Sequence, residues 1–200
     1  MFDKAVNIYT LTAGVQQGGQ TMPEGSLPAR TCGSGTSRCT ACCKTHPLDF
    51  DDGFVKKPAT WCPSCKKGGG CVVYGEDTRP PVCITFRCDW LKGVGGTEDR
   101  PDQTKVILES QTDTPGGDVL VMWEVAEGAL QHPYAITVLD NAIAKGKAVL
   151  AIYCNGSRIF YLPKGLADAG LVDCDPIAAL GIRVEIAISL QAVCAASTHV

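Results

Sequence analysis

The apolar residues of this chain are concentrated in its second half, where they occur in short runs broken by polar and turn-forming residues. Residues 106–108 and 119–125 are two such runs, and Pro115-Gly116-Gly117 lies between them. Short runs rich in Val, Ile and Leu that are bounded by Pro and Gly are typical of buried strands. The pattern therefore predicts two buried strands joined by a turn.

A helix and a hairpin are predicted next. Pro133 occupies a first helical position, which proline favours. The positions that then recur at steps of three and four are Ala135, Ile136, Leu139, Ala142, Ile143 and Gly146. Residues 148–153 predict a strand, and Asn155-Gly156 is the signal of a type I′ hairpin that returns through residues 159–162.

The last predicted strand, residues 182–190, alternates apolar and polar positions and so shows one face to solvent. The order is strand, strand, helix, hairpin, a short helical or irregular piece, and strand. This order predicts an α+β fold over residues 101–200: a small mixed β-sheet with one or two helices packed on it. A Cys-rich metal-binding region of loops and knuckles is expected before it, over residues 32–100.

Residues 1–31 have the composition of an N-terminal arm. Residues 14–28 are rich in Gly, Gln and Pro and cannot build a core. We expect protein partners or neighbouring copies in a larger assembly, such as a virion, to order this arm. The alternative is that it pairs with the edge of its own sheet along residues 182–190.

Charge and hydropathy exclude several classes of protein. The chain has 200 residues, a net charge of −3 and 45% hydrophobic residues, which does not suit a strongly basic nucleic-acid binder. No window of 18 apolar residues predicts a membrane span, and Met1 to Asn7 has an acidic residue and no apolar segment of a secretory signal. We expect a cytoplasmic protein, or a virion protein if a phage encodes it, that is not secreted.

Cysteine is the residue that carries chemistry here. Nine of the twelve cysteines lie between Cys32 and Cys88, and they include two Cys-x-x-Cys pairs. Such pairs let two thiolates hold one metal ion, and a reducing compartment favours metal over disulfides. A disulfide framework fits less well, because nine is odd and the adjacent Cys42 and Cys43 would form a strained bond. The remaining three are expected to be small buried apolar residues: Cys154, Cys174 and Cys194.

The region from Cys39 to Pro101 resembles the YkgJ-type cysteine-cluster family, which is described as a zinc- or iron-chelating domain. The matching motifs are Cys39-Thr40-Ala41-Cys42-Cys43-Lys44, Lys57-Pro58-Ala59-Thr60-Trp61-Cys62, Gly70-Cys71-Val72-Val73-Tyr74, Arg79-Pro80, Cys83, Phe86-Arg87-Cys88-Asp89-Trp90-Leu91 and Arg100-Pro101. The metal ligands that this resemblance implies are Cys39, Cys42, Cys43, Cys62, Cys65, Cys71, Cys83 and Cys88. Cys32 falls outside the family's pattern. The resemblance implies a metal site and no particular reaction.

The metal itself stays open, because zinc and iron–sulfur clusters both use four thiolates. Eight or nine thiols suit two zinc sites, one [4Fe–4S] cluster with spare thiols, or one of each, and the resemblance favours an iron–sulfur cluster. The function predicted is that of a metal-binding structural or interaction protein; the alternative is an iron–sulfur redox or electron-transfer protein. Catalysis through Asp49, Asp51 and Asp52 beside His46 is not favoured, because Asp-Asp-Gly is typical of a turn.

Nucleic-acid binding is not expected. Residues 30–105 hold twelve Lys or Arg and nine Asp or Glu, and thiolates that bind metal remove this small positive excess. Lys56-Lys57 and Lys66-Lys67 are expected to be solvated loop charges. Arg79, Arg87 and Trp90 are expected to pack the cysteine loops, with the arginines bonded to carbonyls or carboxylates.

Overall fold

The computed structural model describes residues 30–32, 39–49, 53, 55–66, 69–112, 118–168 and 182–187. The expected arm over residues 1–31 therefore lies outside the described residues, apart from Arg30 and Thr31. The expectations for Asp51, Asp52, Cys174, Cys194, Lys67, the turn at 115–117 and the strand residues 188–190 also lie outside them.

A five-stranded mixed sheet forms the centre of the molecule, as the sequence predicts. Its strands lie in the order β5 (Val106–Gln111), β6 (Val119–Glu124), β7 (Ala148–Ile152), β8 (Arg158–Pro163) and β9 (Arg183–Ala187). The β5/β6 and β7/β8 pairs are antiparallel, whereas the β6/β7 and β8/β9 pairs are parallel. Together with its helices, this sheet makes the fold α+β.

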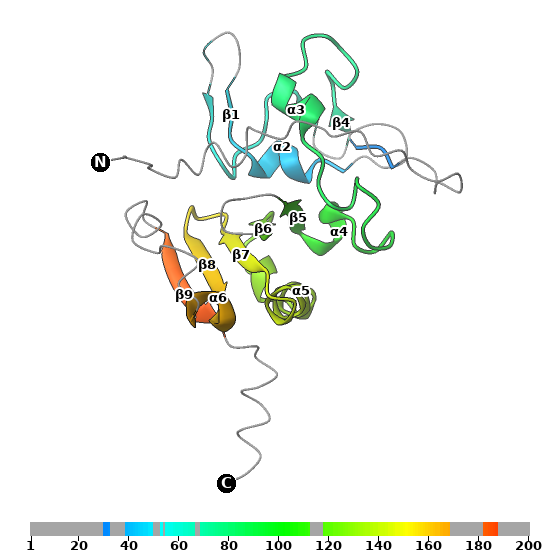
Figure 1. Ribbon diagram of the computed structural model, residues 1–200. Coiled ribbons are helices and arrows are strands. Elements are labelled where there is room, and N and C mark those ends of the chain that lie inside the picture. The colour runs from blue at the N-terminus through cyan, green and yellow to red at the C-terminus, as the bar shows by residue number, and fades with distance from the viewer. Residues whose placement is uncertain are drawn as a thin grey trace.

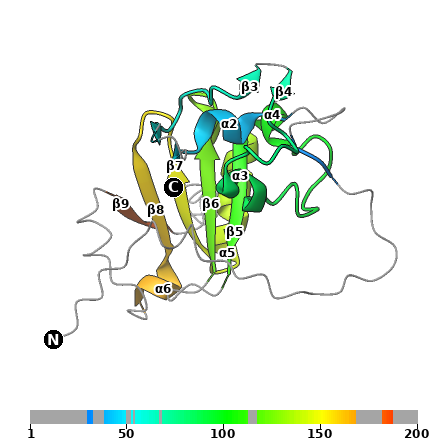
Figure 2. The same ribbon diagram turned by 90° about the horizontal axis from the view of Figure 1, so that it is seen from above.

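Both faces of the sheet are covered, which explains why β6 is a continuous apolar run. Val121 and Trp123 face one core, which they share with Cys39, Cys88 and Trp90 of the Cys-rich region. Leu120 and Met122 alternate with them and face a second core against the helix α5 (Pro133–Ala144). Figures 1 and 2 show the result: the Cys-rich segments on one side of the sheet and α5 on the other.

Helix α5 begins where the sequence indicates. Pro133 stands at the start of α5, and Ala135, Ala142 and Ile143 are its buried positions. This twelve-residue helix is the longest described, and none of the described helices has the length and apolar character needed to cross a membrane. The shorter helices near the sheet are α4 (Pro101–Thr104), η2 (Ala129–Gln131) and α6 (Lys164–Asp168).

The hairpin at Asn155-Gly156 forms, but the predicted type I′ turn is wrong. A type I′ turn needs positive φ at both central residues; Gly156 has φ 89°, whereas Asn155 is not among the described non-glycine residues with positive φ. Instead, the Gly156 N–H donates to the Tyr153 carbonyl at 3.0 Å. The Cys154 N–H is tied at 3.0 Å to the buried carboxylate of Glu124, a tertiary contact that the hairpin signal does not contain.

The edge strand β9 differs from its predicted burial. Ile182 is buried and Arg183 is exposed, as the alternation indicates. Ile186 was expected on the buried face, yet it is 63% exposed. Only β8 pairs with β9 in the described sheet, so an apolar side chain near the end of this edge strand has few neighbours.

The Cys-rich region consists of short elements linked by turns, as its composition predicts. Two two-stranded antiparallel sheets pair β1 with β2 and β3 with β4. The bounds of its elements are α2 (Ala41–Thr45), β1 (Leu48–Asp49), β2 (Val55–Lys56), β3 (Cys65–Lys66), β4 (Gly70–Cys71) and α3 (Pro81–Thr85). Elements this short are not stable alone, so tertiary contacts must hold them.

Candidate metal centre

Helix α2 presents the adjacent Cys42 and Cys43. The His46 N–H closes the end of the helix on the Cys42 carbonyl at 3.1 Å, and the buried Thr45 hydroxyl donates to the Ala41 carbonyl at 2.8 Å. A five-residue helix would not persist in water by itself. Its position against the sheet therefore decides where these two thiols lie.

The second cysteine segment, which begins at Cys62, is hydrogen-bonded to this helix. The Cys62 N–H donates to the Cys43 carbonyl at 2.9 Å, and the Cys65 N–H donates to the Cys62 carbonyl at 2.9 Å. Cys65 of β3 then lies directly opposite Cys71 of β4. The Cys-x-x-Cys spacing thus becomes a tight turn whose first cysteine is bonded to α2 and whose second pairs with Cys71.

The third segment returns the chain to the sheet. Cys83 is in α3, which begins at Pro81, and its N–H donates to the Pro80 carbonyl at 2.8 Å. Asp89, which follows Cys88, joins β5 through its backbone N–H, bonded to the Leu108 carbonyl at 2.8 Å. Its buried carboxylate also accepts from the hydroxyl of Ser110 at 2.7 Å. These bonds hold Cys88 at the edge of the sheet core.

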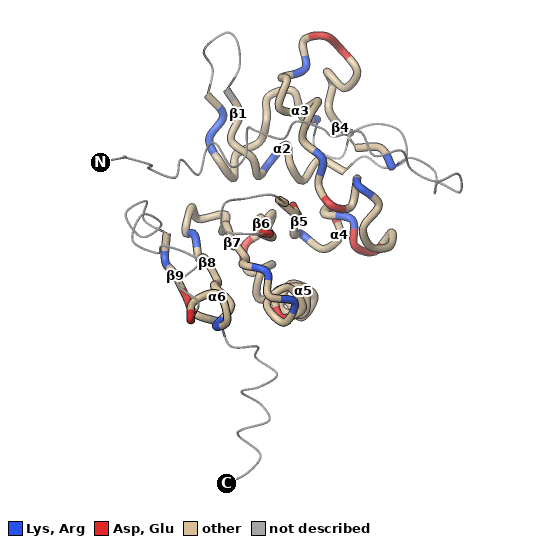
Figure 3. Tube along the Cα trace, viewed as in Figure 1, with Lys and Arg blue, Asp and Glu red and all other residues tan. Residues whose placement is uncertain are grey.

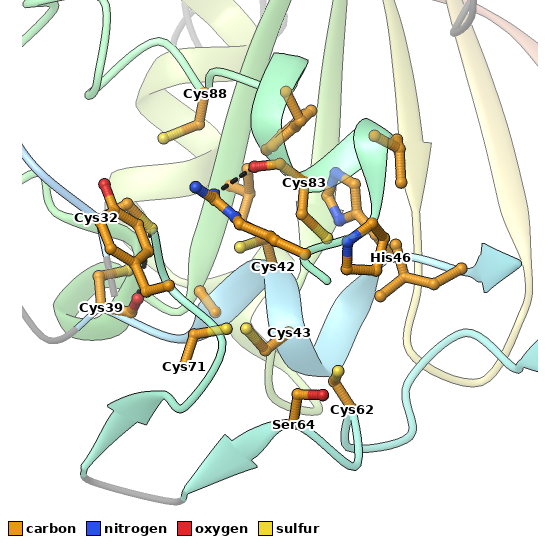
Figure 4. A pocket seen from close by; sticks show the side chains of 18 of the residues that line it. Cys32, Cys39, Cys42, Cys43, His46, Cys62, Ser64, Cys71, Cys83 and Cys88 are labelled. Carbon is orange, nitrogen blue, oxygen red and sulfur yellow. Dashed lines mark hydrogen bonds between the residues drawn. The ribbon is translucent and has the colours of Figure 1, made fainter. Parts of the chain in front are cut away.

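Eight thiols and one imidazole converge on a single cavity of about 70 Å³ (Figure 4). A cavity needs only about 10–15 Å³ to admit one water molecule, so this one has room for a metal centre. The cysteines that line it are Cys32, Cys39, Cys42, Cys43, Cys62, Cys71, Cys83 and Cys88. Seven of the eight ligands implied by the resemblance are in this set. The eighth, Cys65, is not among the residues that line the cavity, although Cys43 is one of the causes that raise its pKa.

Backbone N–H groups favour the thiolate form of two of these cysteines. The thiol of Cys71 accepts a hydrogen bond from the N–H of Val73, and the thiol of Cys88 accepts from Leu91 and Trp90. Burial raises the pKa of both thiols, and these hydrogen bonds offset part of the rise. Bonds of this kind stabilise a thiolate, which is the form that binds metal.

Three further thiols of this region, those of Cys43, Cys65 and Cys83, hold their protons more firmly than a free cysteine does while no metal is bound. Burial is the main cause that raises the pKa of Cys83 to about 11 and that of Cys65 to about 12. A side-chain hydrogen bond with Cys42, in which the Cys43 thiol keeps its proton, is the main cause that also raises the pKa of Cys43. Metal binding at this cavity must therefore release protons, and acid must reverse it.

Cys32 belongs to the cavity, although it lies outside the family's pattern. Its thiol is hydrogen-bonded to Cys39, the main cause that raises its pKa to about 12, and also to Cys42. Arg30 explains this position: its guanidinium donates to the carbonyls of Trp90, Val94 and Gly95 at 2.8, 3.0 and 2.6 Å. It also lies over the Trp90 ring at 4.9 Å. The chain entering the region is thus anchored beside Cys88.

His46 is the second cavity residue that motif reasoning did not assign. Its ring stacks on Trp123 at 4.4 Å and meets Phe86 edge-on at 4.3 Å. Both ring nitrogens are buried and have no hydrogen-bond partner among the described residues. Burial, with the charge of Lys56, lowers its pKa to about 3, so the imidazole is neutral. A neutral imidazole with free nitrogens is a donor that matches zinc or iron.

The expectation that Lys56 is a solvated loop charge is wrong, because its side chain is only 1% exposed. Pairing of β1 with β2 turns it inward, and its ammonium group donates to the carbonyls of Lys44, at 3.1 Å, and of His46. None of the carboxylates that the structure describes forms an ion pair with it. Burial lowers its pKa, while the nearby thiols of Cys62, Cys43, Cys42 and Cys83 raise it. The described neighbours that can balance this buried charge are therefore thiolates.

We expect Lys56→Met to weaken metal binding about 10- to 100-fold, the usual effect of removing a group that supports metal ligands. Methionine keeps an apolar stem and removes the charge that favours thiolates. Competition with a metal chelator measures the affinity. Lys57→Met is the matched control, because Lys57 is exposed and adjacent. Equal losses in the two variants would contradict the role of Lys56.

The expected packing of Arg79 and Trp90 is confirmed. Arg79 donates to the Cys83 carbonyl and lies over the Tyr74 ring at 4.5 Å, and the Trp90 indole donates to the Gly96 carbonyl at 2.9 Å. Arg87, by contrast, is exposed, so its expected packing is wrong. The arginine that packs against Trp90 is Arg30, whose guanidinium lies over the Trp90 ring.

All ten cysteines in the described part of the chain are free thiols, Cys154 included. Cys154 is half-buried rather than fully buried, beside the carboxylate of Glu124. Over the same residues, no three Cys, His, Asp or Glu side chains stand in an arrangement that is already set to hold a metal ion. The side chain of Asp49 lies outside the described residues, as do Asp51 and Asp52. The donor set of the cavity, nearly all sulfur, fits zinc or an iron–sulfur cluster.

No family model, curated protein or solved structure matches this chain. The resemblance to the YkgJ-type family, and the ligands it implies, therefore remain expectations that the motif residues carry.

Proposed function

We propose that this protein is a metal-binding structural and interaction protein whose cysteine cavity holds zinc or an iron–sulfur cluster. The observation that carries the proposal is the convergence of eight thiols, from three separate segments, on one cavity. Buried thiols have no structural need to gather in this way, whereas four-thiolate metal centres require it. The two sulfur atoms that accept backbone N–H bonds, Cys71 and Cys88, support the same reading.

A structural role is favoured because the thiols suffice to close the coordination shell. Closed all-sulfur shells are typical of structural sites, whereas catalytic sites keep an open position. The cavity also lies between the sheet and the outer loops, so a metal there would tie the two together. The Cys-rich region has few large apolar residues, and a region of this size gains only about 3–5 kcal/mol from its core alone.

Electron transfer by an iron–sulfur cluster is the second candidate. The hydrogen bonds to Cys71 and Cys88, and the buried charge of Lys56, are the features that adjust the potential of such a cluster. They would equally stabilise structural thiolates.

The interaction part of the proposal rests on the outer surface of the Cys-rich region. Large apolar side chains are exposed there at Trp61, Val72, Val82 and Ile84. A protein partner or a neighbouring copy in an assembly, such as a virion, would cover them. Figure 3 shows Lys and Arg interspersed with Asp and Glu along the described chain, a pattern that does not favour a nucleic-acid partner. A cytoplasmic or virion location is part of the same proposal.

The test is elemental analysis and a visible absorption spectrum of protein purified without oxygen. We expect zinc without colour, or iron with acid-labile sulfide and a broad visible absorption that fades on reduction. Reversible fading would favour electron transfer. The proposal would be refuted if the purified chain is folded, contains no metal and has every thiol reactive toward a thiol reagent.

A further inference from the structure

The two edges of the central sheet differ in how their main chain is bonded. At the β5 edge, the Asp89 N–H donates to the Leu108 carbonyl at 2.8 Å, and the Asp89 carboxylate accepts from the Ser110 N–H at 2.9 Å. The Lys92 ammonium group donates to the Ser110 carbonyl at 3.2 Å. These contacts occupy polar groups along the outer side of β5, so a further strand cannot add there.

The opposite edge of the sheet, β9, is bonded on one side. Its neighbour is β8, in a parallel register that sets Phe160 against Val184. In the part of the chain that the structure describes, no other segment hydrogen-bonds to the main chain of β9. In Figures 1 and 2, β9 is the outermost strand of the sheet, at the other end from β5. The outer N–H and carbonyl groups of such an edge can pair with an added strand.

An apolar residue and an ion pair are exposed on β9. Ile186 is 63% exposed, although Ile182 on the same face is buried. On the other face, the side chains of Arg183 and Glu185 are 66% and 41% exposed and pair with each other at 2.7 Å. An exposed ion pair contributes little to stability, so these two side chains can exchange it for partners on a second strand.

The sequence of β9 is complementary to itself in one antiparallel register. When Val184 lies opposite Val184 of a second copy, Arg183 lies opposite Glu185 and Ile182 lies opposite Ile186, and each of these pairs occurs twice. Opposite charges and apolar pairs at directly opposed positions stabilise two strands. A shift by one residue would place Val184 opposite a charged side chain. A shift by two would place Arg183 or Glu185 opposite itself, and like charges repel.

We infer that β9 pairs antiparallel with β9 of a second copy of this chain, about a two-fold axis at Val184, so that the five strands of each copy join in one continuous sheet. The exposed Ile186 then lies beside Ile182 of the other copy. The ion pair within each strand is replaced by two ion pairs between the copies. This interface deepens the interaction part of the proposed function, and it lies on the sheet rather than on the Cys-rich region.

The arm is the other segment of this chain that could add to the β9 edge. Its strand-like residues, 6–11, lie outside the described residues and contain no charged side chain. Pairing with them would leave Arg183 and Glu185 without new partners. The charges of β9 therefore favour a second copy of β9.

The experiment measures the mass of the full-length protein by analytical ultracentrifugation over a range of concentrations. The wild type is expected to form a concentration-dependent dimer. Arg183→Glu and Glu185→Arg each set like charges opposite one another twice, so each variant alone should have a dimer dissociation constant raised by about ten-fold or more. An equimolar mixture of the two variants should recover the dimer, because every opposed pair in the mixed dimer carries opposite charges.

Lys147→Glu is the matched control. It breaks a partly exposed ion pair with Asp118, 3.3 Å long, that lies away from β9. This variant should form the dimer as the wild type does. Recovery of the dimer in the mixture also shows that neither charge variant is misfolded.

Three results would overturn the inference. A wild type that stays monomeric at every concentration excludes the dimer, and if a variant without residues 1–12 then dimerises, the arm is the occupant of the edge. Equal dimerisation of the wild type and both charge variants would place the interface elsewhere. A mixture that stays dissociated would exclude the proposed register. Metal content of the same samples separates the two proposals: a monomer with metal refutes only the pairing of β9, whereas a dimer without metal refutes only the metal centre.

Discussion

Replacing Cys62 and Cys65 with Ser is expected to unfold the Cys-rich region and to weaken protection in β6 as well. One structural zinc centre contributes on the order of 10–16 kcal/mol in small peptides, as much as the whole net stability of a typical domain, about 5–15 kcal/mol. The sequence alone predicts that the sheet would survive, since it has its own strands and helix. The structure changes this expectation, because Cys39, Cys88 and Trp90 cover the face of the sheet formed by Val121 and Trp123.

Hydrogen exchange followed by mass spectrometry measures this result. Amides in residues 39–100 should exchange freely in the double variant, and those of β6 should exchange faster than in the wild type. The face of α5 belongs to the other core and should lose less protection. Cys154→Ser, outside the cavity, serves as the control. Unchanged protection in β6 would show that the sheet and the Cys-rich region are independent units.

Trp123→Ala is expected to lower the free energy of unfolding by about 3–5 kcal/mol, the usual loss for a large buried aromatic residue. Trp123 is 8% exposed, stacks on His46 with ring centroids 4.4 Å apart, and donates its indole N–H to Glu109 at 3.2 Å. It therefore links the sheet to His46, which lines the cavity. Metal retention should fall in the same variant, because His46 and α2 lose the surface on which they rest.

Urea unfolding, with metal content measured on the same samples, tests this expectation. Trp61→Ala is the matched control: Trp61 is 42% exposed on the outer surface, and a change there should alter stability by only about 0.5 kcal/mol. Trp123→Phe keeps an aromatic ring for the stack and should fall between the two. A similar effect from Trp61→Ala and Trp123→Ala would show that the sheet does not carry the Cys-rich region.

The local elements of this fold could be predicted from the sequence because their signals lie within a few residues of each other. The apolar run at Val119–Glu124 became β6, and Pro133 with its recurring apolar positions became α5. The cysteine spacing likewise predicted a common site, and seven of the eight expected ligands line one cavity. Covalent spacing limits how far Cys39 and Cys42 can separate, and both line the cavity, so no tertiary knowledge was needed there.

The details that failed depend on contacts between distant segments. Lys56 became a buried cation because the pairing of β1 with β2 placed its ammonium group against the end of α2. Cys32 entered the cavity because Arg30 bonds to carbonyls 60 or more residues away. The turn at Asn155-Gly156 differs from the predicted type, and next to it the Cys154 N–H is bonded to Glu124 of another strand, a contact that the local sequence does not contain.

The sequence by itself therefore determined which elements form and which side chains can bind metal, since periodicity and spacing act over a few residues. Only the tertiary structure decided which donors meet. The sheet needs both of its faces covered, and the Cys-rich region has too few apolar residues to fold alone. The packing of the Cys-rich region against the sheet places His46 beside Trp123 and Cys88 beside the sheet. The cavity therefore lies between the Cys-rich region and the sheet.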